Sequence, residues 1–282
     1  MTRRLAWIVL ALALAACDEE RGQNEQRQIL QDDAPRALAV IRQDLDDGLA
    51  GVRAAAERLA PGFAVEDPAR REGDLRAGLR LVQRPTRQRV PELMTLPITF
   101  LAAVDPDGTV IARDANEDRM RGFDLAGAAP VVRRALDGSA GYALSSLPSL
   151  LENDPPSVTV IFAAPVRHEG RVVGAVAGGL PLWRITQQLS RQLQLENAEE
   201  TRQGEIVWAL LLEGDTQHYH AGFPPDLREL IPDPATRRAG LERSAGGFTG
   251  EVQQYGRWYG FGVIPLPSVG EDVTLILFRS DP

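Results

Sequence analysis

The apolar positions in the first part of the chain follow a helical period. They recur three and four residues apart and share one helix face, at Leu38, Ile41, Leu45, Leu49, Val52, Ala56 and Leu59. Pro35 suits the first turn of this helix, with Asp32 or Asp33 as the cap before it. Pro61 and Gly62 are typical of a helix end. The pattern therefore predicts one long helix with a single buried stripe.

Within the first predicted helix, Gly48 and Gly51 weaken the helix by about 1 kcal/mol each relative to Ala.

A second helical pattern spans residues 66–82, and its apolar face is formed by Leu75, Leu79 and Val82. Prolines between residues 85 and 97 break the chain into short pieces. Residues 35–98 are therefore expected to form an N-terminal helical region.

From residue 100 onward the pattern changes from helical to β. Runs rich in β-branched residues predict strands at 100–104, 109–113, 157–166 and 170–179. Asp105-Pro-Asp-Gly108 and His168-Glu-Gly170 supply the turns between paired strands. A helical stretch at 122–138 separates the two pairs, with loops at 116–122 and 145–156. This order predicts an α+β fold with an antiparallel sheet whose helices are grouped on one face.

Three phrases of this region carry a resemblance, in order: AAVDPDGTVIARD, GFDLAGAAPVVRRALDG and IFAAPVRHEGRVVGAVAGGL. Together they resemble a Cache domain, the extracytoplasmic relative of the PAS fold. The resemblance covers residues 99–182, and long N-terminal helices similar to the one predicted here lead into Cache domains. It implies a ligand site between the sheet and the connecting segments.

A second, shorter cycle follows a polar helical connector that Gly204 ends. Strands are expected at 206–212, 217–220, 250–255, 258–264 and 273–278, with an interrupted helical stretch at 224–243. The order of elements repeats that of the first cycle, so the pair resembles a double Cache module. The predicted fold class is a long N-terminal helix followed by two PAS-like antiparallel-sheet domains in tandem.

The expected domain boundaries follow from these patterns and from the N-terminus. They are a signal peptide at 1–16, a tether at 17–34, the helical region at 35–98, a membrane-distal Cache-like domain at 99–182, a connector helix at 183–204 and a smaller PAS-like domain at 205–282.

The N-terminus has the pattern of a lipoprotein leader. Arg3 and Arg4 precede an apolar run too short to span a bilayer comfortably, and the run ends in Leu14-Ala-Ala-Cys17. This resembles the lipobox of bacterial lipoproteins, which implies lipidation of Cys17. The alternative is an ordinary secretory leader with a chance Cys. Cys17 is the one Cys of the sequence and cannot form an internal disulfide, so lipidation would remove a free thiol. Asp18 resembles the signal for retention in the inner membrane.

The acidic net charge argues against anionic partners, which proteins normally bind through a basic surface. The net charge is −8, and removal of the leader with its two arginines brings it near −10. Nucleic acid and anionic membrane surfaces are therefore not expected as charge-driven partners. The hydrolase, metalloprotease and nucleotide-binding motifs are absent from the sequence. We expect no catalytic residues and no cofactor.

One pair of residues has metal-ligand spacing. His218 and His220 share a strand face, and Glu213 or Asp215 lies across a turn as a third ligand. Two half-exposed polar residues on a sheet explain the same pattern, so no metal site is predicted.

The predicted ligand site rests on charged, polar and small residues of the first Cache-like domain. The candidates are Arg113, Arg119, Arg121, Tyr142, Ser145, Gly178 and Gly179. An Arg can hold a carboxylate by two parallel hydrogen bonds, although each taken alone is more often a surface charge, and Asp118 or Asp124 could pair with Arg119 or Arg121. The Trp and the strand Asp of amino-acid-binding double Cache domains have no counterparts here. A carboxylate is one candidate ligand, and an amino acid is not the expected one.

These features predict a periplasmic, lipid-anchored protein that binds a small molecule. The sequence ends at Pro282 without a cytoplasmic output segment, so a membrane signalling or transport protein is expected as partner. One rival hypothesis is a structural or interaction lipoprotein with an empty Cache-like scaffold. A second is an enzyme whose site is not recognisable from the sequence.

Overall fold

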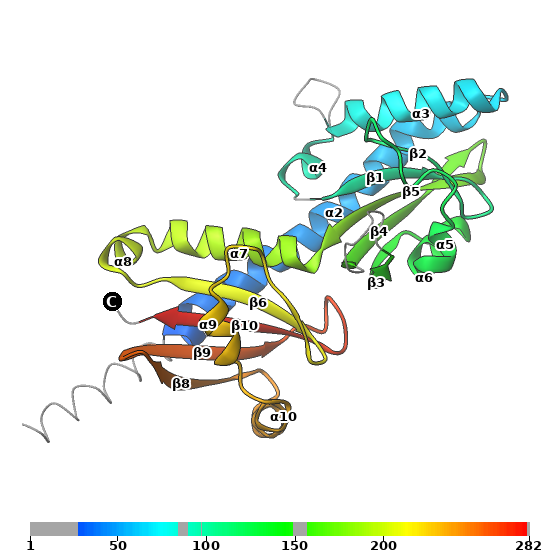
Figure 1. Ribbon diagram of the computed structural model, residues 1–282. Coiled ribbons are helices and arrows are strands. Elements are labelled where there is room, and N and C mark those ends of the chain that lie inside the picture. Colours follow the sequence, from blue (N-terminus) through cyan, green and yellow to red (C-terminus); the bar gives the residue numbers. More distant parts are fainter. Residues whose placement is uncertain (1–27, 84–89, 97, 149–156, 281–282) are drawn as a thin grey trace, which may run out of the picture. The chain divides into compact units, whose positions relative to one another are not determined.

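The computed structural model describes residues 28–83, 90–96, 98–148 and 157–280, and it has an α+β fold with two antiparallel five-stranded sheets (Figure 1). The chain divides into two compact units. Residues 41–185 form the first-sheet unit, and the described residues before 41 and after 185 form the second-sheet unit. The predicted fold class is confirmed. The leader, Cys17 and Asp18 lie outside the described residues.

The N-terminal helices carry the predicted apolar stripes. They are η1 (Ile29–Asp33, π-helical), α2 (Ala34–Phe63), α3 (Pro68–Gln83) and α4 (Pro91–Thr95). Most of the α2 stripe is buried, including Ile41, Leu45, Val52, Ala56 and Leu59. Leu75, Leu79 and Val82 of α3 are also buried, which confirms the second helical pattern.

The predicted cap of the long helix is wrong, and the helix ends one residue after the predicted Pro61-Gly62 stop. Asp33 is not a cap, because helical backbone continues N-terminally from it to residue 28. Its buried carboxylate instead binds Arg279, 246 residues away in the sequence. At the other end α2 continues through Pro61 to Phe63. Pro61 removes a backbone bond only in the last turn, and Phe63 is buried with its ring packed against Gly174.

The first sheet has the strand order β2-β1-β5-β4-β3. Its strands are β1 (Phe100–Val104), β2 (Val110–Arg113), β3 (Gly141–Leu147), β4 (Ser157–His168) and β5 (Arg171–Pro181). The two predicted strand pairs are confirmed. The sequence did not predict β3, and Ser145 therefore lies in a strand and not in a loop. β3 is an edge strand with mostly half-buried residues, so it lacks the apolar run of an interior strand.

Helices cover both faces of the first sheet, so the predicted grouping on one face holds only for the helices that follow β2 (Figure 1). On one face α2 packs closely, with Gly48 against Phe162 of β4. On the other face α5 (Leu125–Ala128) and α6 (Pro130–Leu136) close an apolar core with the strands. These are two short helices and not the predicted single stretch at 122–138. Pro130 disfavours helical backbone at Ala129, whose φ is −134° and ψ 98°.

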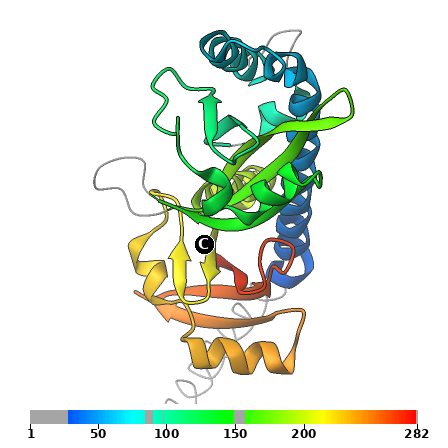
Figure 2. The ribbon, with the colours of Figure 1, turned by 90° about the vertical axis from the view of Figure 1, so that its right-hand side faces the viewer.

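The second sheet has the corresponding order β7-β6-β10-β9-β8. Its elements are α7 (Leu182–Glu196), α8 (Ala198–Gln203), β6 (Val207–Glu213), β7 (Thr216–His218), α9 (Pro225–Glu229), α10 (Pro234–Arg243), β8 (Phe248–Gln254), β9 (Arg257–Pro265) and β10 (Val273–Ser280). All five predicted strands are confirmed. α10 packs beside β8, and Gly240 of α10 lies against the Phe248 ring (Figure 1 and Figure 2).

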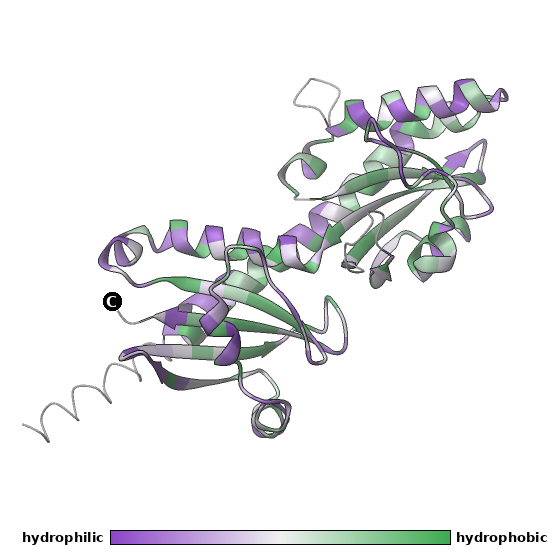
Figure 3. Ribbon diagram, viewed as in Figure 1, coloured by the Kyte–Doolittle hydropathy of each residue, from purple (hydrophilic) through white to green (hydrophobic). Residues whose placement is uncertain are grey.

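Hydropathy follows this layering. The central strands β1, β5, β6 and β10 are predominantly hydrophobic, whereas α3 and α7 show hydrophilic residues along their length (Figure 3). In the second sheet, Ser190 of α7 accepts a hydrogen bond from the Ala209 amide at 3.0 Å, and Gln194 donates to the Val207 carbonyl at 3.0 Å. Polar side chains of α7 thus bind the backbone of β6.

A buried ionic cluster fixes the start of the N-terminal helices within the second-sheet unit. The Asp33 carboxylate accepts from Arg279 at 3.1 Å and from Asn197 at 3.2 Å. Arg279 also donates to Glu205 at 2.7 Å, and Arg36 to Asn197 at 3.1 Å. Burial raises the pKa of Asp33, while the charge of Arg279 opposes that rise. The cluster joins η1, α2, the α7–α8 junction and β10.

Candidate functional site

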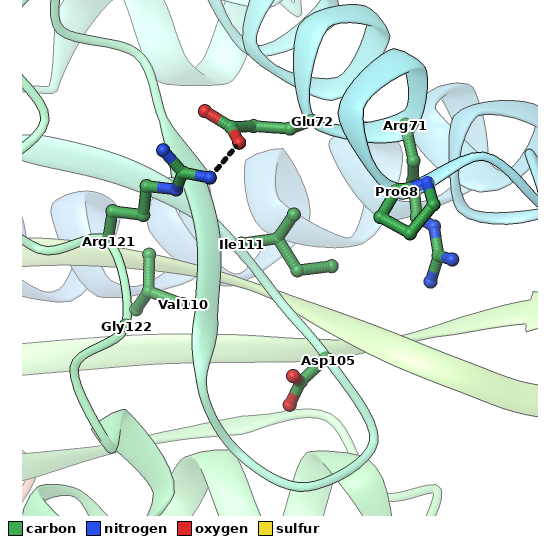
Figure 4. A pocket seen from close by; sticks show the side chains of 8 residues that line it. All are labelled: Pro68, Arg71, Glu72, Asp105, Val110, Ile111, Arg121 and Gly122. Carbon is green, nitrogen blue, oxygen red and sulfur yellow. Dashed lines mark ion pairs between the residues drawn. The ribbon is translucent and has the colours of Figure 1, made fainter.

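A hollow of about 380 Å³ lies beside β2 in the first-sheet unit (Figure 4). α3 supplies one wall, the turn after β1 and the strand β2 supply the floor, and the segment before α5 supplies the other wall. The lining residues are Pro68, Arg71, Glu72, Asp105, Val110, Ile111, Arg121 and Gly122. We call this space the β2 hollow.

One wall of the β2 hollow is held by a carboxylate with two arginine partners. Glu72 binds Arg121 through one oxygen and Arg76 through the other, each at 2.6 Å. The Glu72 side chain is 15% exposed, whereas that of Arg121 is 63% exposed. The pair therefore joins a shielded carboxylate to a guanidinium that remains open to solvent and to a ligand.

The Asp118 carboxylate holds the backbone of the segment that carries Arg121. This carboxylate accepts from the backbone amides of Arg113 at 2.9 Å and Met120 at 3.1 Å, and it lies 3.7 Å from the Arg76 guanidinium. Met120 is fully buried in the core of the first sheet. The Gly122 amide donates to Val110 at 2.9 Å, which seats the segment against β2. Arg121 is thus presented from a fixed backbone.

Two further charges face the β2 hollow with unused hydrogen-bonding capacity. Arg71 donates to the Glu66 carbonyl at 3.1 Å, and its buried Nε has no hydrogen-bond partner in the part of the chain that the structure describes. Asp105 accepts from the amides of Asp107 and Thr109 through Oδ1, at 3.0 and 2.9 Å. Figure 4 shows that Arg71, Asp105 and Arg121 come from three separate segments around Ile111. Charges of both signs around a small space suit a polar ligand that carries a carboxylate.

The structure separates the predicted arginines. Arg121 lines the β2 hollow and pairs with Glu72, and neither Asp118 nor Asp124 is its partner. Arg119 is exposed and pairs with its neighbour Glu117 at 3.4 Å. Arg113 extends over the Phe100 ring, 5.9 Å from its centroid, and donates to the Thr99 carbonyl at 3.1 Å.

The remaining predicted residues lie on the sheet. Tyr142 packs on Phe162, with 5.8 Å between ring centroids. Ser145 is buried, and its hydroxyl has no hydrogen-bond partner among the described residues. Gly178 faces Val52 of α2, and the Phe100 ring, rather than open space for a ligand, lies over Gly179. Their assignment to a ligand site, like that of Arg113 and Arg119, stays a prediction.

Sequence reasoning missed three charged residues of the β2 hollow. Glu72 and Arg71 lie on the polar face of α3, where charges are normally solvated. Asp105 accepts hydrogen bonds within its turn, and this explains an Asp at that position without a ligand. The charge pattern of α3 offered one usable signal. Glu72 and Arg76 are four residues apart, which favours a pair on one helix face.

In the second-sheet unit, His218 Nε2 lies 3.7 Å from a Glu213 carboxylate oxygen, and His220 stacks on Trp208 with 5.9 Å between ring centroids. Burial lowers the pKa of both imidazoles, and Glu213 opposes this for His218. Over the described ranges, no three residues of metal-ligating type are grouped to hold an ion. The described helices also include none with the length and apolar character to cross a bilayer.

Comparison with known proteins finds the same fold at low sequence identity. No protein-family model matches the chain, and no curated protein matches its sequence. The sensory domain of the Campylobacter jejuni chemoreceptor Tlp3 with isoleucine bound is similar at a TM-score of 0.57 and 8% identity, over 94% of this chain and 95% of that one. The V. cholerae histidine kinase DctB sensor domain is similar at 0.53 and 13%, over 94% and 98%.

An extracellular ligand binding receptor from Desulfohalobium retbaense has a TM-score of 0.52 and 18% identity. The match covers 86% of this chain but only 39% of that receptor. At these identities the similarity concerns the fold. The long helix and two five-stranded sheets of this chain match tandem PAS-like, Cache-type sensor domains.

Proposed function

We propose that this protein is a periplasmic sensor lipoprotein that binds a small molecule and acts through a partner protein. The observation that carries the proposal is the fold, which is similar to chemoreceptor and histidine kinase sensor domains over 94% of the chain. The extracytoplasmic setting of such domains agrees with the leader-like N-terminus.

The ligand would bind in the β2 hollow and carry a carboxylate. The Arg121 guanidinium is already held at one side by Glu72 and has further N–H groups open to solvent. Arg71 supplies a second guanidinium, and Asp105 and Glu72 would repel anions that lack a balancing donor. The site therefore favours a small carboxylate that also bears a hydroxyl group.

A thermal-shift screen of small polar metabolites tests ligand binding. A ligand that binds only the folded protein stabilises it by about 2.7 kcal/mol at a hundredfold excess over Kd. At least one carboxylate should raise the unfolding temperature in a concentration-dependent way. A flat response across the library would favour the rival hypothesis of a structural or interaction lipoprotein with an empty scaffold.

The enzyme hypothesis makes a different prediction. Catalysis needs an acid, base, nucleophile or metal placed within reach of a substrate. Incubating the purified protein with a metabolite extract, followed by mass spectrometry, would show turnover if such a site exists. We expect metabolite levels to stay constant apart from stoichiometric binding.

The membrane anchor would be the lipid on Cys17. Globomycin should cause the precursor to accumulate, and Cys17→Ser should yield a soluble or uncleaved form. Detergent phase partitioning of the wild type provides the matching measurement, with the protein expected in the detergent phase. Recovery in the aqueous phase without precursor accumulation would contradict lipidation. Asp18 favours the inner membrane, which fractionation of the membranes tests.

The partner would be a membrane protein of signalling or transport. Cross-linking in intact cells should recover such a protein with the wild type and lose it when Cys17→Ser displaces the sensor from the membrane. We expect no association with nucleic acid, because the chain is strongly acidic.

A further inference from the structure

A second hollow of about 410 Å³ lies on the opposite face of the first sheet from α5, beside α2. α2 lines it with Arg53, Glu57 and Ala60, the α6–β3 connection with Gly138 and Ala140, and β4 with Ala164, Pro165 and Arg167. We call this space the α2 hollow. It shares no residue with the β2 hollow.

The register of the strands explains why this space is open. The pairing of β3 with β4 ends at Gly141 and Ala163, so β4 continues through residues 164–168 without a β3 neighbour. Small side chains at Ala60, Ala140 and Ala164 leave the space beside α2 unfilled. Gly138 has a φ of +101°, and a Cβ there would lie 2.9 Å from the Arg167 guanidinium. The hollow is thus bounded by backbone and small residues, with charges at its rim.

The charges at this rim are not compensated within the described chain. Among the described residues, the side chains of Arg53 and Glu57 form no hydrogen bond or ion pair, although the two are four residues apart on α2. Arg167 donates to the Gly138 carbonyl at 3.2 Å and has no carboxylate partner in the described ranges. In the β2 hollow, by contrast, Arg121 is paired with Glu72. The α2 hollow therefore presents two arginines against a single carboxylate.

We propose that the α2 hollow is a binding site for a small oxyanion held between Arg53 and Arg167. A guanidinium offers five N–H donors in a plane and binds carboxylate or phosphate oxygens through two parallel bonds. The bond to Gly138 uses one donor of Arg167 and fixes that side chain beside the hollow. An anion there links α2 to β4 by charge-assisted bonds, and Glu57 accepts from a hydroxyl of the bound species.

Isothermal titration calorimetry of the full chain at constant ionic strength tests this site, with inorganic phosphate and succinate as the two probes. At least one probe should bind saturably with one-to-one stoichiometry. Loss of a charge-assisted contact weakens binding by about tenfold or more, so Arg53→Gln and Arg167→Gln should each have this effect. Arg42→Gln, an exposed arginine of the same helix, should leave the affinity unchanged.

Arginine modification of the unaltered protein gives a readout that does not depend on variants. The bound probe should protect Arg53 and Arg167 from phenylglyoxal, and Arg42 should react equally with and without it. Saturable binding of neither probe would overturn the proposal. So would binding that is lost in Arg121→Ala and retained in both α2-hollow variants, since the anion would then occupy the β2 hollow.

Discussion

Gly48 of α2 lies directly against the ring of Phe162 on β4, and a methyl group at Gly48 would come within 2.5 Å of the ring atoms. The glycine that weakens the helix in isolation is therefore required for its close packing on the sheet. Phe162 is fully buried and also packs on Tyr142 of the neighbouring strand, so the ring has little freedom to move away.

Replacing this glycine should destabilise the protein. Gly48→Ala gains up to about 1 kcal/mol of helix propensity but overpacks the α2 interface, which costs about 1–3 kcal/mol. The matched control is Gly73→Ala in α3, where an added Cβ meets nothing within 4 Å. That variant should be more stable by about 0.5–1 kcal/mol. Urea unfolding should show a lower free energy of unfolding for Gly48→Ala and a higher one for Gly73→Ala. Stabilisation by Gly48→Ala would contradict the packing account.

The buried pair of Asp33 and Arg279 should be a major determinant of stability in the second-sheet unit. Their side chains are 0% and 3% exposed, respectively. Asp33→Ala leaves Arg279 with Glu205 as its charged partner, and breaking a buried pair costs about 3–5 kcal/mol. Asp32→Ala changes the exposed neighbouring carboxylate and should shift stability by less than about 0.5 kcal/mol.

A charge-free replacement of the same pair should recover much of this loss. The variant Asp33→Leu with Arg279→Met removes both buried charges, and well-packed apolar residues often replace such pairs without net cost. A double-mutant cycle by chemical denaturation should therefore show strong coupling between the two positions. Additive effects of the two single changes would mean that the residues do not act as a pair.

The histidines of the second-sheet unit should titrate below their usual range. Burial lowers the pKa of His218 and His220, so the unfolded chain, with a pKa near 6.5, binds their protons more readily. Their contribution to stability is present above pH 6.5 and is lost as the pH falls through the folded pKa values. NMR titration with His218→Asn and His220→Asn for assignment checks this. Titration of both imidazoles at or above 6.5 would contradict it.

Sequence patterns predicted the helices and strands that are determined by residues close together in the sequence. The stripe of α2, the paired β-branched runs and their turns all depend on neighbours a few residues away, and all are confirmed. β3 was missed because this edge strand, with four half-buried residues followed by Ser145 and Ser146, has no apolar run in its sequence.

Features that depend on distant residues could not be predicted from these patterns. Asp33 has the local context of a helix cap, and only the fold brings Arg279 to it. The space over Gly179 is filled by the ring of Phe100 from the neighbouring strand, and the local sequence around Gly179 gives no sign of that ring. Arg121 and Glu72 likewise become partners only when α3 packs beside β2.

The most direct test of the proposed sensor compares two arginines of one segment, which differ in their relation to the β2 hollow. Arg121 lines it, whereas Arg119, two residues earlier, is exposed and pairs with Glu117. Glu72 keeps Arg76 as partner when Arg121 is removed, so the fold should survive the change.

The measurement is the affinity of a carboxylate identified by the thermal-shift screen, determined by calorimetry for the wild type, Arg121→Ala and Arg119→Ala. The loss of a charge-assisted contact should weaken binding to Arg121→Ala by about 1.5–3 kcal/mol, with Arg119→Ala equal to the wild type. Equal affinity in all three proteins would contradict the assignment of the ligand to the β2 hollow.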